Sequence, residues 1–169
     1  ASMAPRKEPM RNFLDYLIHQ VKKTNTSIHL NKEATAESIK QFAADVVILA
    51  HGAKHVLVEI NGSQKNKVLN VKNAFSSADS LGNTVAIVGG GPEGCELADY
   101  LASRGKKITL IEMRRVLGLE LVAHPRYHVC ERLKKMGAQL YINTKVTEIG
   151  HDYIVVSRRR EADQKLEGF

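Results

Sequence analysis

Residues 84–94 have the sequence TVAIVGGGPEG. The apolar residues 85–88 predict a short buried strand, and Gly89, Gly91 and Gly94 follow it with the spacing G-x-G-x-x-G. This spacing is typical of dinucleotide binding when it lies between a strand and a helix. Gly89 would permit the tight turn, Gly91 the close approach of a pyrophosphate, and Gly94 the close packing of the helix on the strand. The pyrophosphate would then bind at the positive end of the helix dipole.

The residues after this turn complete the pattern. Apolar residues at helical spacing follow Gly94, and Gly105 predicts the end of that helix. A second apolar strand, residues 108–111, is followed by Glu112, which stands about 20 residues after Gly91, as the fingerprint requires. A carboxylate there can accept hydrogen bonds from the ribose hydroxyls of an adenosine. The alternative is an ordinary strand–helix–strand unit whose glycine-rich turn binds no ligand.

The composition is ordinary for a globular protein, with 43% hydrophobic and 25% charged residues in a chain of 169. No apolar run approaches the roughly 20 residues of a membrane span, and the first residues lack the pattern of a signal peptide. Cys95 and Cys130 form no C-x-x-C motif, which argues against a disulfide, a zinc site or a redox pair within the chain. We therefore expect a cytoplasmic protein without membrane association, with both cysteines packed on the apolar faces of helices.

The net charge is +7 and the pI is near 9.5. A basic protein can bind nucleic acid, but the basic residues here are spread along the chain and form no stripe. The one local cluster, Arg158, Arg159 and Arg160, is followed by Glu161 and Asp163, which favours a solvated turn. We expect no nucleic-acid partner, and a mildly positive surface would instead attract an anionic dinucleotide.

Hydrophobic periodicity predicts helices and strands in the rest of the chain. Within the first sixty residues a helix, a strand, a helix and a strand follow one another, which suggests parallel pairing in an α/β layer. The last thirteen residues are polar and predict no strand. The predicted helices cover residues 10–23, 33–42, 73–81 and 125–136, and the predicted strands cover residues 27–31, 46–50, 139–142, 145–149 and 153–156, with less regular patterns at 56–62 and 67–71.

Three segments together resemble a known family. GGGPEGCELADYL, starting at Gly89, matches the G-G-G-x-x-G-x-E-x-A pattern of flavoprotein reductases that bind two dinucleotides. DVVILAHGA, starting at Asp45, resembles the segment that ends the first half of their flavin domain. NFLDYLIHQVKK, starting at Asn12 and followed by SIHLN at residues 27–31, resembles the helix and strand before that segment. Over about residues 5–157, the chain resembles the C-terminal half of the NADH:flavin oxidoreductases of the 2,4-dienoyl-CoA reductase and trimethylamine dehydrogenase group.

The resemblance implies a portion of a larger flavin-dependent oxidoreductase. In that family an N-terminal barrel binds FMN beside an iron–sulfur cluster, and a C-terminal module binds FAD and NAD(P)H and delivers hydride to the flavin. This chain has no region of barrel length, no cysteine cluster and no second glycine fingerprint for FAD. We therefore expect a fragment that does not perform the full reaction alone and whose partners are a nicotinamide dinucleotide and the remainder of the parent flavoprotein. FAD is expected in that parent, and FMN and the cluster only in its N-terminal part.

The expected architecture is α/β, with a three-layer, Rossmann-like lobe and part of a flavin-domain lobe. Residues 1–60 would form the flavin-domain part, residues 61–83 a crossover, and residues 84–169 an NAD(P)-binding domain that lacks its last strand. The chain departs from the family pattern at His51, where threonine is usual, and at Glu93, whose carboxylate could repel a phosphate.

The candidate cofactor-binding residues surround the glycine turn. Glu112 is expected to bind the adenosine ribose, and it favours NAD(H) over NADP(H) because a carboxylate repels a 2′-phosphate. Arg114 and Arg115 leave NADP(H) open as the alternative, since an arginine can pair with a 2′-phosphate. The other interpretation of these two arginines is a solvated turn. In the resembling family a glutamate at the position of Glu96 lies near the nicotinamide; otherwise Glu96 complements the helix dipole. The full set is Gly89, Gly90, Gly91, Pro92, Glu93, Gly94, Glu96, Glu112, Arg114 and Arg115.

No catalytic residue is predicted, which fits hydride transfer, because the cofactors carry that chemistry. His51 could approach a flavin, although a lone histidine beside a glycine is more often structural. His124 and His128 have the spacing of helical metal ligands, but Pro125 lies between them and no H-E-x-x-H motif is present, so no metal is expected. A second hypothesis is a non-catalytic nucleotide-binding or interaction module with a vestigial site, which predicts a sizeable exposed apolar face.

Overall fold

The computed structural model describes residues 4–54, 56, 58–64, 67–159 and 161–169. The chain divides into two compact units, one of residues 1–10 and 55–169 and the other of Arg11–Lys54. Helix α1, Pro9–Lys23, contains the boundary and confirms the helix predicted at residues 10–23. The predicted domain limits rest on the family resemblance and remain predictions.

The unit Arg11–Lys54 contains one further helix, α2, Ala36–Gln41, inside the predicted range 33–42. Thr35 caps this helix: its Oγ1 accepts a hydrogen bond from Ser38 N at 3.2 Å, and Ser38 Oγ accepts one from Thr35 N at 2.9 Å. The reciprocal pair satisfies two amide groups that would otherwise have no partner, so the helix begins after Thr35 and not at Glu33.

The strands predicted at residues 27–31 and 46–50 are not formed, and the parallel pairing expected there is therefore wrong. A strand needs a hydrogen-bonded neighbour, and no described residue of this unit pairs with either segment. Val46, Ile48 and Leu49 are instead 76%, 84% and 74% exposed. Their composition favours a buried strand, but this unit supplies no sheet to receive it.

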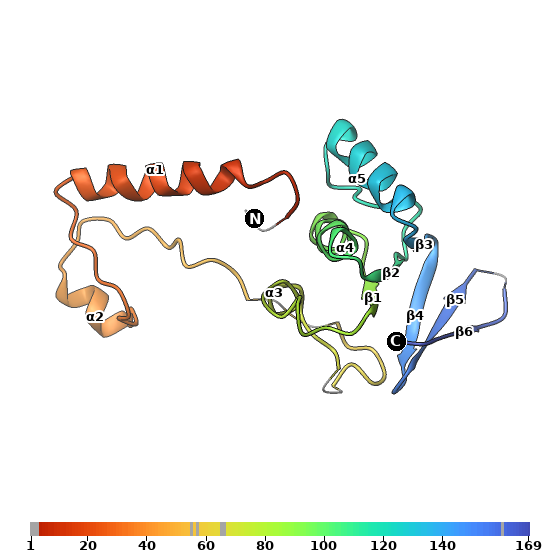
Figure 1. Ribbon diagram of the computed structural model, residues 1–169. Helices are drawn as coiled ribbons and strands as arrows, with labels where there is room; N and C mark the ends of the chain where they lie inside the picture. Colours follow the sequence, from red (N-terminus) through yellow and green to blue (C-terminus); the bar gives the residue numbers. More distant parts are fainter. Residues whose placement is uncertain (1–3, 55, 57, 65–66, 160) are drawn as a thin grey trace. The chain divides into compact units, whose positions relative to one another are not determined.

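The larger unit holds a parallel sheet in the order β1-β2-β3 (Figure 1). Its strands are β1, Thr84–Val88, β2, Lys107–Ile111, and β3, Gln139–Tyr141. α4, Pro92–Ser103, connects β1 to β2, and α5, Ala123–Lys135, connects β2 to β3. The alternating strands and helices predicted from the glycine turn onward are confirmed.

A second, antiparallel sheet has the order β4-β5-β6 and consists of β4, Thr144–Ile149, β5, Tyr153–Arg158, and β6, Gln164–Glu167. The predicted hairpin between β4 and β5 is confirmed. The expectation of no strand in the last thirteen residues is wrong, because β6 pairs along β5. β6 is an edge strand with mainly exposed side chains, so its sequence carries little apolar signal.

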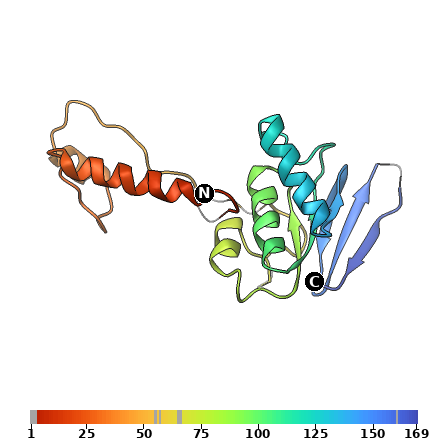
Figure 2. The ribbon, with the colours of Figure 1, turned by 45° about the horizontal axis from the view of Figure 1, so that its top comes forward.

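Alternation along the strands of the parallel sheet builds two cores, one on each face. Ile108 and Leu110 pack on the side of the helices, in a cluster that includes Leu101 and Leu133. Ile111 packs on the other side against the antiparallel sheet. Figure 2 shows α4 and α5 on one side of the parallel sheet and β4–β6 on the other. The α/β, Rossmann-like, three-layer fold is therefore confirmed.

The segment before β1 is mostly irregular. α3, Val71–Ser76, begins two residues before the helix predicted at 73–81, because the side chain of Asn70 caps it by accepting a hydrogen bond from Asn73 N at 2.9 Å. The strands considered at 56–62 and 67–71 are not formed, although residue 57 lies outside the described part. Asn61 makes an isolated parallel bridge with Glu148 of β4. None of the helices in the described residues has the length and apolar character needed to span a membrane.

Candidate dinucleotide-binding site

The glycine turn lies between the end of β1 and the start of α4. Gly89 has φ +105°, a conformation that side-chain-bearing residues rarely adopt, and its N–H donates a hydrogen bond to Ile111 O at 2.8 Å. A Cβ on Gly94 would lie 1.9 Å from Gly89 O, so only glycine fits where α4 approaches the turn. These contacts fix the backbone on the inner side of the turn.

Gly90 and Gly91 differ in what lies in front of them. A Cβ on Gly90 would lie 2.4 Å from Leu117 Cδ2 and 2.9 Å from Glu112 Cβ, so Gly90 is packed against the protein. A Cβ on Gly91 would meet nothing nearer than Glu120 Oε2 at 3.8 Å and Arg114 Nη2 at 4.0 Å. The space in front of Gly91, called here the open side of the turn, is therefore bordered by the ends of two flexible side chains at van der Waals distance and by no backbone or core atom of the described residues within 4 Å.

Gly91 is also the N-cap of α4, and because glycine has no side chain it accepts no capping hydrogen bond from the first N–H groups of the helix. Pro92 follows at the first helical position, and the exposed Glu93 lies in the first turn. The N-terminus of a twelve-residue helix with an open glycine in front of it can bind a phosphate through the backbone and the helix dipole.

The Glu112 carboxylate lies against this turn, at the carboxyl end of β2. It is 4% exposed. Its Oε2 accepts a hydrogen bond from Gly90 N at 2.7 Å, and its Oε1 accepts one from Arg114 N at 2.7 Å. Because a carboxylate can accept about four hydrogen bonds, these two contacts position it and leave acceptor capacity for a ligand. Its role toward a ribose remains a prediction.

Arg114 contacts both Glu112 and Glu120. Glu120 is a residue of this site that the sequence analysis did not identify. Arg114 Nε lies 3.3 Å from Glu112 Oε1, and Arg114 Nη1 lies 2.5 Å from Glu120 Oε1. The hydrogen bond to Glu120 raises the pKa of Arg114, and the hydrogen bond from Arg114 lowers the pKa of Glu120. Both groups are therefore charged near neutral pH. Glu120 stands in an irregular loop, so no periodicity could have predicted this pair.

Arg115 lines a hollow of about 560 Å³ just beyond the carboxyl ends of β2 and β3. This is the edge of the sheet at which the glycine turn lies. Arg158 is the last residue of β5, and its Nε donates a hydrogen bond to Thr144 Oγ1 at 2.8 Å. Arg160 of the predicted turn lies outside the described residues. The hollow is lined by Arg115, Ile142, Asn143, Arg158, Arg159 and Glu161.

Glu96 is on α4, one turn beyond the glycine loop, and forms an ion pair with Lys7 Nζ. The side chain of Glu96 is 19% exposed. The ammonium group of Lys7 balances the negative charge of Glu96. The position of Glu96 near a nicotinamide stays a prediction. His51 is exposed in the unit Arg11–Lys54.

The two cysteines are packed differently. Cys95 is fully buried on α4, and its Sγ donates a hydrogen bond to Gly90 O at 3.3 Å. Burial raises its pKa to about 12. Cys130 is half-buried, and burial raises its pKa as well. The packing predicted for both is thus complete only for Cys95, and neither thiol is activated as a nucleophile.

The histidine pair lies on α5. His124 Nε2 and His128 Nε2 are 3.3 Å apart, within hydrogen-bonding distance, and both side chains are exposed. Across the described residues no group of three or more candidate metal ligands comes together. The pair therefore has no third protein ligand in that part of the chain.

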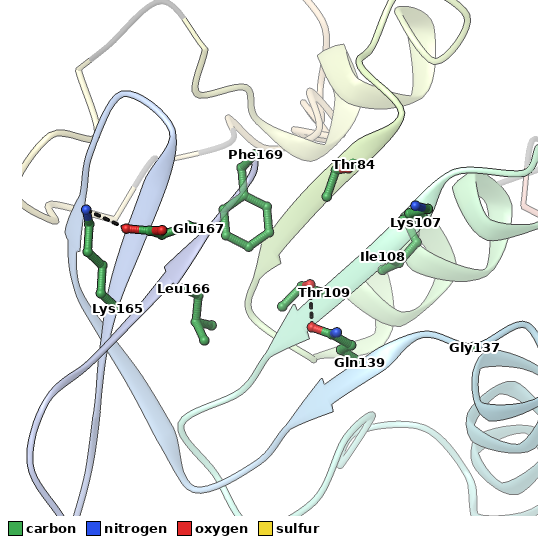
Figure 3. Close-up of a pocket in the computed structure, with 10 residues that line it drawn as sticks. All are labelled: Thr84, Lys107, Ile108, Thr109, Gly137, Gln139, Lys165, Leu166, Glu167 and Phe169. Carbon is green, nitrogen blue, oxygen red and sulfur yellow. Dashed lines mark hydrogen bonds and ion pairs between the residues drawn. The ribbon is translucent and has the colours of Figure 1, made fainter.

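Figure 3 shows a second hollow, of about 480 Å³, between the parallel sheet and β6. It is lined by Thr84, Lys107 and Gln139, the first residues of the three parallel strands, together with the paired Lys165 and Glu167. Because the strands are parallel, this hollow lies at the sheet edge opposite the glycine turn. It is not part of the candidate dinucleotide site.

The fold and this site define a class of protein. Residues 6–167 match the pyridine nucleotide-disulphide oxidoreductase family, and the chain belongs to that family. Its relatives include the bilirubin reductase of Mediterraneibacter gnavus, 33% identical over 88% of this chain and 23% of the relative. The NADH oxidase of Thermoanaerobacter brockii is 30% identical over 88% of this chain and 24% of the relative.

Among solved structures, a 2-naphthoyl-CoA reductase is similar over 99% of this chain and 25% of its own, with a TM-score of 0.89 and 26% identity. This chain therefore spans about a quarter of the length of these relatives. Membership of a pyridine nucleotide-disulphide oxidoreductase family agrees with the oxidoreductase class expected from the sequence.

Proposed function

We propose that this chain is the NAD(P)H-binding portion of a flavin-dependent oxidoreductase that delivers hydride from NAD(P)H to a flavin. The main support is the glycine turn: Gly91 is open on its outer side, and the buried Glu112 carboxylate is hydrogen-bonded to Gly90 N at 2.7 Å. An adenine dinucleotide fits this donor set, because it carries a diphosphate for the helix N-terminus and ribose hydroxyls for a carboxylate.

The residues of this chain would bind and orient the cofactor. Gly89, Gly90, Gly91, Pro92, Glu93 and Gly94 would hold the diphosphate through the backbone, and Glu112 would accept a hydrogen bond from the adenosine ribose. The bound nicotinamide would supply the hydride, and FAD bound elsewhere in the parent protein would accept it. FMN and an iron–sulfur cluster would belong to a further part of that parent.

We propose NAD(H) as the preferred cofactor over NADP(H). Glu112 supports this preference, because its carboxylate would repel a 2′-phosphate. Arg114 is paired with the Glu112 carboxylate, which reduces its attraction for a 2′-phosphate. Arg115 keeps NADP(H) as the alternative, since it lines the basic hollow at the same sheet edge.

We further propose that the parent is an enoate or 2,4-dienoyl-CoA reductase-like enzyme. The family resemblance of the glycine turn and of DVVILAHGA supports this assignment. The similarity to a 2-naphthoyl-CoA reductase points in the same direction. The parent's barrel would hold the substrate, so this chain would supply electrons and not select the substrate.

Calorimetric titration of the chain with NADH and NADPH tests the proposed binding. We expect binding to both and tighter binding of NADH. Gly91→Val should abolish binding, because its side chain fills the space in front of the turn, whereas Gly82→Ala, where a Cβ meets only Thr84 O at 3.9 Å, should bind like the unmodified chain. No heat with either nucleotide at millimolar concentration, in a chain with native circular dichroism, would refute the proposal.

A vestigial, non-catalytic interaction module is the second candidate. The observation that favours it is the exposure of large apolar side chains in the unit Arg11–Lys54, such as Phe13 at 55% and Leu49 at 74%. This candidate predicts a folded chain that binds neither nucleotide, so the same titration separates the two functions.

A further inference from the structure

The open side of the glycine turn faces an ion pair. A Cβ placed on Gly91 would have Glu120 Oε2 at 3.8 Å and Arg114 Nη2 at 4.0 Å as its nearest neighbours. A phosphate group that approaches Gly91 must enter this space. The first side chains that it meets are therefore one carboxylate, which repels it, and one guanidinium, which attracts it.

Arg114 has a second partner besides Glu120 in this ion pair and is held more firmly. Arg114 also contacts the buried Glu112. Its backbone N–H donates a hydrogen bond to Glu112 Oε1 at 2.7 Å, and its side-chain Nε lies 3.3 Å from the same atom. The Glu120 side chain is 50% exposed and forms an ion pair with Arg114, with 2.5 Å between Arg114 Nη1 and Glu120 Oε1. The carboxylate of Glu120 can thus turn into solvent while the guanidinium remains beside the turn.

The Glu120 carboxylate resembles a bound ligand. It is an anion, it pairs with Arg114, and it stands in front of the glycine where a dinucleotide would place its diphosphate. A phosphate oxygen can accept the same N–H donors from the guanidinium, commonly in a bidentate arrangement. Both anions cannot occupy one site, because like charges at such short distance repel.

We propose that Glu120 is an affinity-determining residue whose carboxylate lies at the diphosphate position before the cofactor binds and exchanges with it. On binding, the diphosphate displaces the Glu120 carboxylate, and Arg114 changes partner from Glu120 to a phosphate oxygen. This inference rests on the proposed function, since it concerns the same site. It assigns to Glu120 a negative contribution to affinity and to Arg114 a positive one.

Glu120→Gln tests the exchange. Glutamine keeps the size of the side chain and removes the charge that competes with the phosphate, so we expect the Kd for NADH to fall about three- to tenfold, a change of about 0.7–1.4 kcal/mol. Arg114→Gln should raise the Kd. In the Arg114→Gln background, Glu120→Gln should produce a smaller gain, because there is no longer an arginine for which the two anions compete.

Glu167→Gln is the matched control. It also removes one ion-paired carboxylate, 2.8 Å from Lys165, but at the opposite edge of the parallel sheet. Its Kd for NADH should equal that of the unmodified chain, so a gain seen in both variants would reflect net charge and overturn the assignment.

The outcomes separate this inference from the proposed function. If the unmodified chain binds NADH and Glu120→Gln binds it equally or more weakly, the exchange is refuted and the proposed function stands. A gain confined to NADPH would overturn the diphosphate assignment, because it would place the exchange at the 2′-phosphate. If the unmodified chain binds neither nucleotide, the proposed function itself fails.

Discussion

At the scale of single residues, Cys95 has the most strongly altered chemistry. Its burial, the nearby Cys130 and the Glu112 carboxylate raise its pKa from the ordinary value of 9.0 to about 12. In the unfolded chain the thiol loses its proton near pH 9, whereas in the folded chain it keeps it. The folded state therefore retains its full stability below pH 9 and loses stability as the pH rises from 9 toward 12.

This difference predicts a steeper alkaline loss of stability than in a chain without the thiol. Urea unfolding at pH 8 and pH 10 should show a larger drop in the free energy of unfolding for the unmodified chain than for Cys95→Ala. Lysines and tyrosines titrate in both proteins and cancel in the comparison. Equal drops in the two proteins would mean that the buried thiol is not coupled to folding.

Sequence patterns predict those residues of the candidate site that shape the backbone of the glycine turn. Gly89 and Gly94 follow from spacing alone, because a turn that leaves a strand and enters a helix needs those glycines. Glu120 was not predictable in this way. Its contact with Arg114 depends on how an irregular loop folds back to the glycine turn, and no periodic signal records that path.

At the scale of elements, one buried ion pair joins α4 to α5. Arg132 contacts Asp99 with Nε at 3.1 Å from both carboxylate oxygens and with Nη2 at 2.6 Å from Oδ2. The Asp99 side chain is only 3% exposed. Removing Arg132 would leave a buried carboxylate without its cation, which is costly because water cannot replace the lost contact.

We expect Arg132→Met to lower the free energy of unfolding by about 3 kcal/mol, measured by urea unfolding at pH 7. Lys134→Met breaks the exposed pair with Glu131 on the same helix and should cost less than about 1 kcal/mol. Similar values for the two variants would show that the α4–α5 contact depends on apolar packing and not on this pair.

The elements that the sequence predicted best are those with a strong one-sided pattern. β2 has four buried residues in a row, and α4 has a regular buried face, so the strand predicted at 108–111 and the helix end predicted near Gly105 both lie within two residues of the observed bounds. β6 was missed because an exposed edge strand is specified by its hydrogen bonds to β5 and not by its side chains. The segment 46–50 failed in the opposite way, since an apolar run forms a strand only beside another strand.

At the scale of the whole molecule, the two compact units differ in how much core they have. The larger unit contains two core clusters, one on each face of its parallel sheet. In the unit Arg11–Lys54, neither α1 nor α2 has a buried residue. Burial of apolar surface is the main source of folding free energy, so the stabilities of the two units must differ.

Amide hydrogen exchange followed by mass spectrometry should resolve this difference within one sample. Peptides from residues 11–54 should exchange within seconds, because no residue of α1 or α2 is buried and the helical hydrogen bonds can therefore open readily. Peptides from α4 and β2 should stay protected for minutes to hours and serve as the internal standard. Equal protection in both units would mean that the apolar side chains of residues 11–54 are covered in solution, for example by self-association, which a concentration series would then detect. Rapid exchange would show that these apolar side chains are uncovered in the isolated chain, as the fragment hypothesis expects.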